Sequence, residues 1–179
     1  GRSPLKQLRK TGHERAAGPM VDRPFFFACP EPERMPQMRT IDTGSASLRC
    51  AVEGEGPLVI MVHGFPESWY SWRHQIGPVA DAGFTACAID VRGYGGSDKP
   101  EPVGAYAMEH IVGDLVGLRE ALSPGAPAVL VGHDWGAMVT WAFAQFRPDL
   151  LNGIAAMSVP YMPPIEMSLI DMLKANYGD

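Results

Sequence analysis

The stretch that decides the fold is VGHDWG at residues 131–136, which follows an apolar segment at 128–132 and precedes a helical pattern at 137–146. The apolar segment predicts a buried strand, and the pattern after it predicts a helix that Pro148 stops. Two glycines stand two positions on either side of Asp134. We therefore expect a turn so tight that Asp134 takes a strained, positive-φ backbone and a Cβ at either glycine would crowd neighbouring segments.

Strands and helices alternate along the chain on both sides of this turn. We expect a hairpin with a turn at Gly44, apolar strands that follow it, and helices between those strands, with Pro78 kinking or ending the first helix. The predicted strands are 39–43, 47–52, 58–63, 84–90, 128–132 and 151–158, and the predicted helices are 69–80, 106–122 and 137–146. This rhythm implies right-handed crossovers and an α/β fold, a three-layer α/β/α sandwich around a mostly parallel sheet. Ligands of such sheets bind beyond the C-terminal ends of the strands, where His63, Asp90 and Asp134 fall.

Aspartate at the tip of the turn favours one class of reaction. Its carboxylate, with an ordinary pKa of about 3.9, is ionised at neutral pH, whereas a serine in this position needs a base. The N-terminus of the following helix favours such an anion. Asp134 is thus suited to attack a saturated carbon and form an alkyl-enzyme ester, by opening an epoxide or displacing a halide. The alternative is that Asp134 only caps the helix.

A second segment, HGFP at 63–66, follows the predicted strand 58–63. Where a nucleophile sits at such a strand-to-helix turn, this position supplies one backbone N–H to an oxyanion hole, and the residue after the nucleophile supplies the other. The amides of Phe65 and Trp135 are therefore expected to hold the carbonyl oxygen of Asp134 during ester hydrolysis. The alternative for HGFP alone is a plain turn.

Three segments fall in the order and spacing typical of one family: HGFPESWYSWR (63–73), DVRGYGGSDKP (90–100) and VGHDWGA (131–137). They resemble the corresponding segments of the soluble epoxide hydrolases, which have the α/β-hydrolase fold. The resemblance runs from about Met38 to the C-terminus.

This resemblance implies the roles of several residues. Asp134 would be the nucleophile, and Phe65 and Trp135 would donate their amides to the oxyanion. Trp135, Phe65 and Pro66 would line the substrate pocket, and the Phe65–Pro66 peptide would be cis. The implied partners are a small-molecule epoxide and water, with no cofactor and no metal.

Two related classes differ at informative positions. Haloalkane dehalogenases also have the aspartate turn followed by tryptophan, but they usually place a polar residue at the position of Phe65. Fluoroacetate dehalogenases have an arginine where this chain has Trp135. Both differences favour a neutral epoxide. A haloalkane dehalogenase-type hydrolase remains one alternative, and a non-catalytic hydrolase-fold protein that binds ligands or partners is another.

All five histidines precede Asp134, namely His13, His63, His74, His110 and His133. In this fold the acid and the water-activating histidine follow the nucleophile. We therefore expect residues 38–179 to be the N-terminal half of a hydrolase domain, with the C-terminal half and the helical lid absent and no activity alone. His63 is expected to order its loop, His133 to pack or hydrogen-bond beside the turn, and Arg92 to anchor its loop.

Composition limits the remaining possibilities. Residues 1–36 carry 7 basic and 4 acidic residues, 7 − 4 = +3, and the remainder carries 8 − 16 = −8. The acidic main part argues against a nucleic-acid partner. No apolar run approaches the roughly 20 residues of a membrane span.

The basic segment 1–37 is rich in proline and aperiodic, which predicts a disordered extension. The three cysteines, Cys29, Cys50 and Cys87, lack metal-ligand spacing and predict reduced thiols in a cytoplasmic protein. The oligomeric state cannot be read from the sequence.

Overall fold

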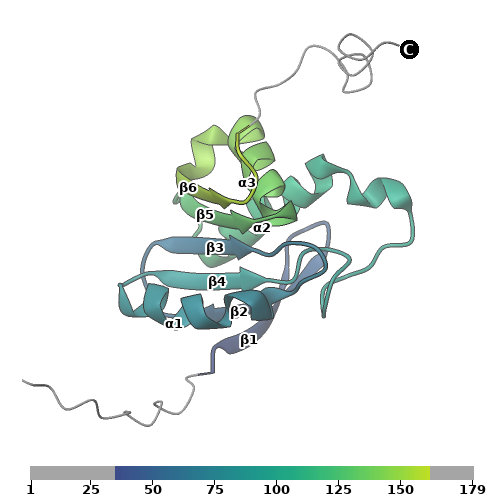
Figure 1. Cartoon of the computed structure of the whole chain (residues 1–179). Helices are drawn as coiled ribbons and strands as arrows, with labels where there is room; N and C mark the ends of the chain where they lie inside the picture. Colours follow the sequence, from purple (N-terminus) through teal and green to yellow (C-terminus); the bar gives the residue numbers. More distant parts are fainter. Residues whose placement is uncertain (1–34, 162–179) are drawn as a thin grey trace, which may run out of the picture. The chain divides into compact units, whose positions relative to one another are not determined.

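The computed structural model describes residues 35–161, and Figure 1 shows their arrangement. The predicted extension at 1–37 lies almost wholly outside the described residues, and so does the end of the predicted domain after residue 161. Two residues assigned to that extension, Met35 and Pro36, precede the first strand, and Gln37 opens it.

Six strands form one mixed sheet in the described part of the chain. Their order across the sheet is β1-β2-β4-β3-β5-β6. Strand β3 pairs in parallel with β4 and β5, and β5 pairs in parallel with β6, whereas β1–β2 and β2–β4 are antiparallel. The strands are β1 (Gln37–Asp42), β2 (Ser47–Glu53), β3 (Leu58–Val62), β4 (Thr85–Ile89), β5 (Ala128–His133) and β6 (Leu151–Met157). The mostly parallel sheet and the hairpin with its turn at Gly44, φ 88, are as predicted.

Helices cover both faces of the sheet, so the predicted three layers are confirmed (Figure 1). The three α-helices are α1 (Arg73–Asp81), α2 (Met108–Leu122) and α3 (Trp135–Phe146). Short 3-10 turns are η1 (Trp69–Trp72), η2 (Val103–Tyr106) and η3 (Pro148–Leu150). Helix α1 packs on one face, and α2 and α3 pack on the other. No helix within residues 35–161 has the length and apolar character needed to cross a bilayer.

Two predicted helices differ in detail from those observed. The segment 69–80 is a 3-10 turn followed by α1, which continues through Pro78 to Asp81. The expectation that Pro78 could end this helix is wrong: the proline ring removes one hydrogen bond, but Ala82 N–H still donates to the Pro78 carbonyl. The helix predicted from 106 begins at Met108, because Ala107 is extended, with φ −60 and ψ 148.

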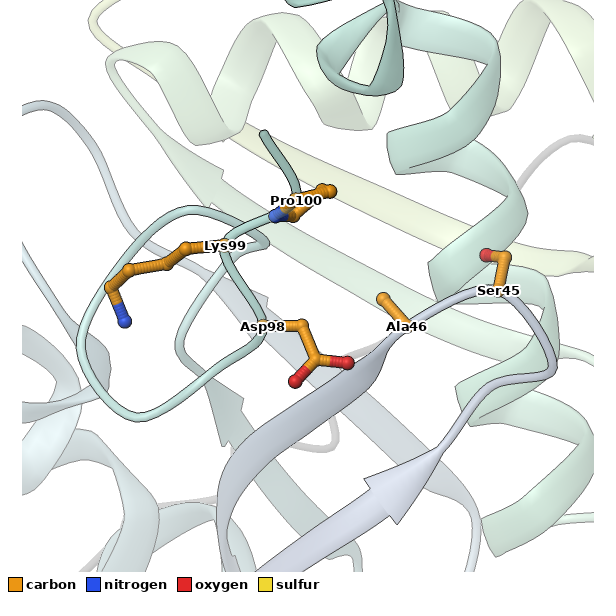
Figure 2. Close-up of a pocket in the computed structure, with 5 residues that line it drawn as sticks. All are labelled: Ser45, Ala46, Asp98, Lys99 and Pro100. Atoms are coloured by element: carbon orange, nitrogen blue, oxygen red, sulfur yellow. The ribbon is translucent and has the colours of Figure 1, made fainter. Parts of the chain in front are cut away.

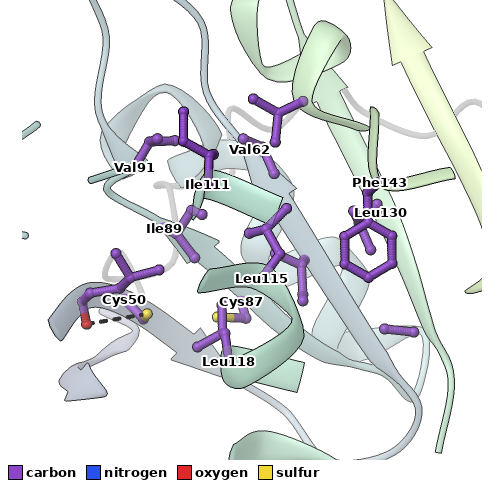
Figure 3. Packing of buried hydrophobic residues seen from close by; sticks show 14 of the residues in the cluster. Cys50, Val62, Cys87, Ile89, Val91, Ile111, Leu115, Leu118, Leu130 and Phe143 are labelled. Carbon is purple, nitrogen blue, oxygen red and sulfur yellow. Dashed lines mark hydrogen bonds between the residues drawn. The ribbon is translucent and has the colours of Figure 1, made fainter. Parts of the chain in front are cut away.

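The buried core explains why the sequences of the strands are continuous apolar runs. Every residue of β3 is buried, since neighbouring strands flank it and helices cover both of its faces. On the face covered by α2 and α3, Leu115 and Phe143 pack over Leu130 of β5, as Figure 3 shows. Burying each such side chain contributes about 1.5–3 kcal/mol. On the other face, Trp72 and Ile76 pack over the opposite side of β3.

Candidate active site

The turn between β5 and α3 has the backbone that the sequence predicts. Asp134 has φ 53 and ψ −119, directly between the end of β5 and the first residue of α3. A Cβ on Gly132 would overlap the carbonyl of Gly136, and a Cβ on Gly136 would overlap the carbonyl of Val62. Both glycines are therefore required by close packing of the turn against β3 and α3.

The side chain of Asp134 does not cap the helix that it precedes. It makes no capping hydrogen bond to α3, so the interpretation of Asp134 as a simple helix cap is wrong. Its carboxylate is instead turned toward the loop after β3, where Phe65 N–H donates to Asp134 Oδ1 at 2.9 Å. Gly64 is needed for this approach, because a Cβ there would lie 2.8 Å from the Cβ of Asp134.

Two main-chain amides act on the Asp134 carboxylate. The N–H of Phe65, and second that of Trp135, lowers the pKa of Asp134 below its ordinary value. The carboxylate is consequently ionised at neutral pH and held at the N-terminus of α3, where the helix dipole also favours an anion. These are the two amides that the sequence assigned to an oxyanion hole. The Phe65–Pro66 peptide is cis, as the family resemblance implied.

His63 orders the loop after β3, as predicted. Its Nδ1 lies 2.7 Å from the Gly64 carbonyl, and its Nε2 accepts from Val91 N–H at 3.1 Å. The proton therefore belongs on Nδ1, and both ring nitrogens are occupied. Burial lowers the pKa of His63, which keeps the ring neutral. A neutral, fully buried imidazole with no free nitrogen is unsuited to activate water.

His133 lies beside the turn, and its partner is a residue to which the sequence had assigned no role. His133 Nδ1 is 3.6 Å from Glu67 Oε1, and Glu67 Oε2 accepts from Gly64 N–H at 3.2 Å. Glu67 thus connects the loop after β3 to the end of β5. Its position four residues after His63, within the HGFPESW segment, was the available signal. His74 and His110 are exposed on their helices, and His13 lies outside the described residues.

Asp90 and Arg92 follow β4 and are buried. The carboxylate of Asp90 accepts from Trp69 N–H at 2.9 Å and from Gly96 N–H at 2.8 Å. Arg92 forms two hydrogen bonds with Asp114 of α2, from Nε at 2.7 Å and from Nη2 at 2.6 Å. The expectation that Arg92 anchors its loop is confirmed. Asp114 was missed because its partner lies 22 residues away in the sequence.

Aromatic rings contact one another at the loop after β3. The Phe65 side chain is 68% exposed, and its ring meets Tyr94 edge-on at 6.5 Å. Tyr94 also meets His63 at 5.0 Å. Pro66 is exposed, and Trp135 is half-buried against the core under α2 and α3. Phe65 thus meets Asp134 through its amide, and Trp135 directly follows Asp134 in the chain. That Phe65, Pro66 and Trp135 line a substrate pocket stays a prediction.

A separate hollow of about 270 Å³ lies between the β1–β2 turn and the loop after β4 (Figure 2). Its lining residues are Ser45, Ala46, Asp98, Lys99 and Pro100. The ammonium of Lys99 donates to the carbonyls of Gly95 and Ser97, and Asp98 accepts from Ser47 N–H. None of the lining residues belongs to the turn at Asp134 or to the loop after β3, so this hollow is separate from the candidate site.

Comparison with known proteins agrees with this geometry. The family model for the alpha/beta hydrolase fold matches residues 57–179. Epoxide hydrolase 3 of Siraitia grosvenorii is 47% identical over 142 residues, which cover 78% of this chain and 44% of that protein. Epoxide hydrolase A of Mycobacterium tuberculosis is 43% identical over 146 residues, covering 80% of this chain and 45% of that protein. A crystal structure of an epoxide hydrolase from Vigna radiata has a TM-score of 0.74 and 41% identity, covering 83% of this chain and 46% of that one.

The chain spans less than half the length of these relatives. The residues that the family model matches include the strands from β3 to β6 and the turn that carries Asp134. Because the family model covers more than half of the chain, the chain belongs to the α/β-hydrolase fold family, and within that family it is similar to the epoxide hydrolases.

Proposed function

We propose that this chain carries the nucleophilic half of an epoxide hydrolase, which converts an epoxide to a vicinal diol through an ester on Asp134. One observation carries the proposal: an ionised carboxylate stands at a positive-φ turn with Phe65 N–H 2.9 Å from its Oδ1. A carboxylate held in this way attacks carbon without a base. The relatives named epoxide hydrolases support an epoxide as the substrate.

In the first step, one carboxylate oxygen of Asp134 forms a bond to a ring carbon, and the bond between that carbon and the ring oxygen breaks. The electron pair of the broken bond goes to the ring oxygen, which takes up a proton from the solvent. The product is a hydroxyalkyl ester of Asp134. The Phe65 amide fixes Oδ1, so that oxygen is suited to become the carbonyl oxygen of the ester.

In the second step, water attacks the carbonyl carbon of the ester, and negative charge develops on its carbonyl oxygen. The amides of Phe65 and Trp135 are the donors proposed to stabilise this oxyanion, a type of interaction worth about 2.7–4 kcal/mol per donor. Collapse of the tetrahedral intermediate breaks the bond between the carbonyl carbon and the alkyl oxygen. One proton of the attacking water goes to that oxygen, which gives the diol, and the other is released to the solvent, which restores the carboxylate of Asp134. Among residues 35–161 we assign no side chain as the base for this step.

We also propose a cytoplasmic location. Cys50 and Cys87 are free thiols, both buried in the sheet, and this is typical of proteins from a reducing compartment.

The test is to incubate the chain with styrene oxide and to locate any adduct by peptide mass spectrometry. We expect one adduct, on Asp134, and none in Asp134→Asn, because a neutral amide is a far poorer nucleophile. Asp149 is an internal control: its pKa is also lowered, by Arg147, but it lies outside the turn and should stay unmodified. An adduct on Asp149 but not on Asp134 would contradict the proposal.

A further inference from the structure

We propose that Asp90 is a positioning residue, which holds the oxyanion loop (residues 63–69) so that Phe65 N–H points at Asp134. The role rests on the proposed function of Asp134 and extends it to a residue that does not meet the substrate, since Asp90 is 0% exposed.

The carboxylate of Asp90 joins two loops that are separate in the sequence. Its Oδ1 accepts from Trp69 N–H at 2.9 Å, at the end of the oxyanion loop, and its Oδ2 accepts from Gly96 N–H at 2.8 Å. A buried carboxylate is unfavourable unless hydrogen bonds replace its lost water. Two main-chain N–H groups, one on each oxygen, do so here. An aspartate at this position thus fixes both loops relative to the end of β4.

The other end of the oxyanion loop is attached to the same strand end. His63 contacts the Gly64 carbonyl through Nδ1 and accepts from Val91 N–H through Nε2. Val91 is the residue after Asp90. The loop is therefore held at residue 64 by one hydrogen-bonded side chain and at residue 69 by another. Phe65, whose amide meets Asp134, lies between these two attachments.

Asp90 itself is held firmly enough to position a loop. Its N–H donates to the Arg49 carbonyl of β2, and its carbonyl accepts from Ser97 Oγ at 2.6 Å. Ser97 Oγ in turn accepts from Arg49 N–H at 2.8 Å. The following loop wraps closely around the carboxylate, because a Cβ on Gly95, φ 46, would overlap Asp90 Oδ2.

The substitution Asp90→Asn separates this role from simple packing. Asparagine has the same size but only one acceptor oxygen, so either Trp69 N–H or Gly96 N–H faces an amide donor. The oxyanion loop is then released at residue 69 or pushed away. The Phe65 amide of this loop then moves away from the Asp134 carboxylate.

Two NMR signals of the 1–179 chain report this movement without any epoxide. We expect Asp90→Asn to shift the Phe65 amide proton upfield and to move the titration of the Asp134 carboxyl carbon to higher pH. Asp98→Asn is the matched control: it makes the same chemical change in the same loop, but the Asp98 carboxylate accepts from Ser47 N–H and not from the oxyanion loop, so both signals should stay in place. Unchanged signals in a folded Asp90→Asn protein would overturn the proposal.

A second pair of variants tests the role of Asp90 if Asp90→Asn does not fold. Trp69→Pro removes the donor, and proline is tolerated at the first position of a helical turn, which Trp69 occupies in η1. Trp69→Ala loses the same indole ring but keeps the N–H. We expect both signals to move in Trp69→Pro and to stay in Trp69→Ala, and equal behaviour of the two would overturn the role of Asp90. Failure of styrene oxide to label a chain with an intact Phe65–Asp134 hydrogen bond would instead contradict the proposed function.

Discussion

Asp134 occupies a backbone conformation that residues with a side chain rarely adopt, and such conformations cost about 1–3 kcal/mol. The surrounding structure maintains it through glycines that admit close contacts. Gly132 meets α3, Gly136 meets the end of β3, and Gly64 meets Asp134 itself. The carboxylate consequently projects from a turn that packs closely at these three glycines. Its position is set by this packing, which single substitutions can test.

Gly132→Ala is expected to destabilise the protein by about 3 kcal/mol, because the new methyl group would overlap the Gly136 carbonyl and the Thr140 hydroxyl. Gly113→Ala is the matched control, since a Cβ at Gly113 of α2 meets no atom within 4 Å. There alanine should stabilise the helix by about 1 kcal/mol. Urea denaturation measures both changes. Equal midpoints for the two variants would contradict the close packing of the turn.

The Asp134 carboxyl should titrate below the value of about 3.9 found for a free aspartate, because the amides of Phe65 and Trp135 stabilise its charged form. The direction in which protein stability changes with pH follows from this lowered pKa. The folded state binds fewer protons than the unfolded state, so the contribution of Asp134 is present above the unfolded pKa and is lost as the pH falls through the folded pKa. Carbon NMR of the carboxyl group measures the titration. A midpoint at or above 3.9 would mean that the amides do not bind the carboxylate.

Among the elements, helix α2 connects the hairpin to the loop after β4. Its Asp114 accepts from Arg92 and also from the hydroxyls of Thr43 and Ser45 in the β1–β2 turn. Arg92 also donates to the Ala105 carbonyl near η2. These contacts hold the loop that begins at Arg92. The same loop wraps around the carboxylate of Asp90. A buried ion pair at this point therefore supports the arrangement of the strand ends.

Asp114→Ala should destabilise the protein by about 3–5 kcal/mol, because it leaves the charge of Arg92 buried without its partner. The side chains of this pair are 4% and 2% exposed. Asp149→Ala breaks the comparable pair with Arg147, whose side chains are 40% and 60% exposed, and should change stability far less. Thermal and urea unfolding of both variants provide the comparison. A large effect of Asp149→Ala with a small effect of Asp114→Ala would be the contrary result.

In the molecule as a whole, the two faces of the sheet are not equally covered. On the face of α2 and α3, Leu130 of β5 is fully buried, whereas Val129 and Val131 on the opposite face are only partly buried. Helix α1 covers β4 and β2 on that face. Strand β6 forms one edge of the sheet described by residues 35–161.

The chain of residues 1–179 is expected to form at most one equivalent of ester with styrene oxide and to produce no diol continuously. His63 has both nitrogens occupied, and His74 and His110 are exposed on helices away from the turn. Ester formation proceeds without a base, but ester hydrolysis needs one. Chromatography of the diol over many equivalents of substrate checks this. Sustained diol formation by the pure chain would show that the assigned division of roles is wrong.

The sequence alone was sufficient for the local features of this protein. The strands, the turn at Asp134 and the mostly parallel sheet are all encoded in short patterns, because glycine requirements and apolar periodicity act over a few neighbouring residues. The roles of the Phe65 and Trp135 amides stay a prediction. Three short segments were enough to predict which strand ends meet, since parallel strands bring their C-terminal ends to one edge. They are residues 63–73, 90–100 and 131–137.

Only the tertiary structure decided which polar groups pair across that edge. Asp90 meets Trp69, Arg92 meets Asp114, and Glu67 approaches His133. Each pair joins residues that lie far apart in the sequence, and nothing local distinguishes a buried acceptor from an exposed one. Burial then fixes the chemistry, because His63 and Asp90 are enclosed and fully hydrogen-bonded while Asp134 is left accessible. That is why, of three polar residues at neighbouring strand ends, we propose only Asp134 as the nucleophile.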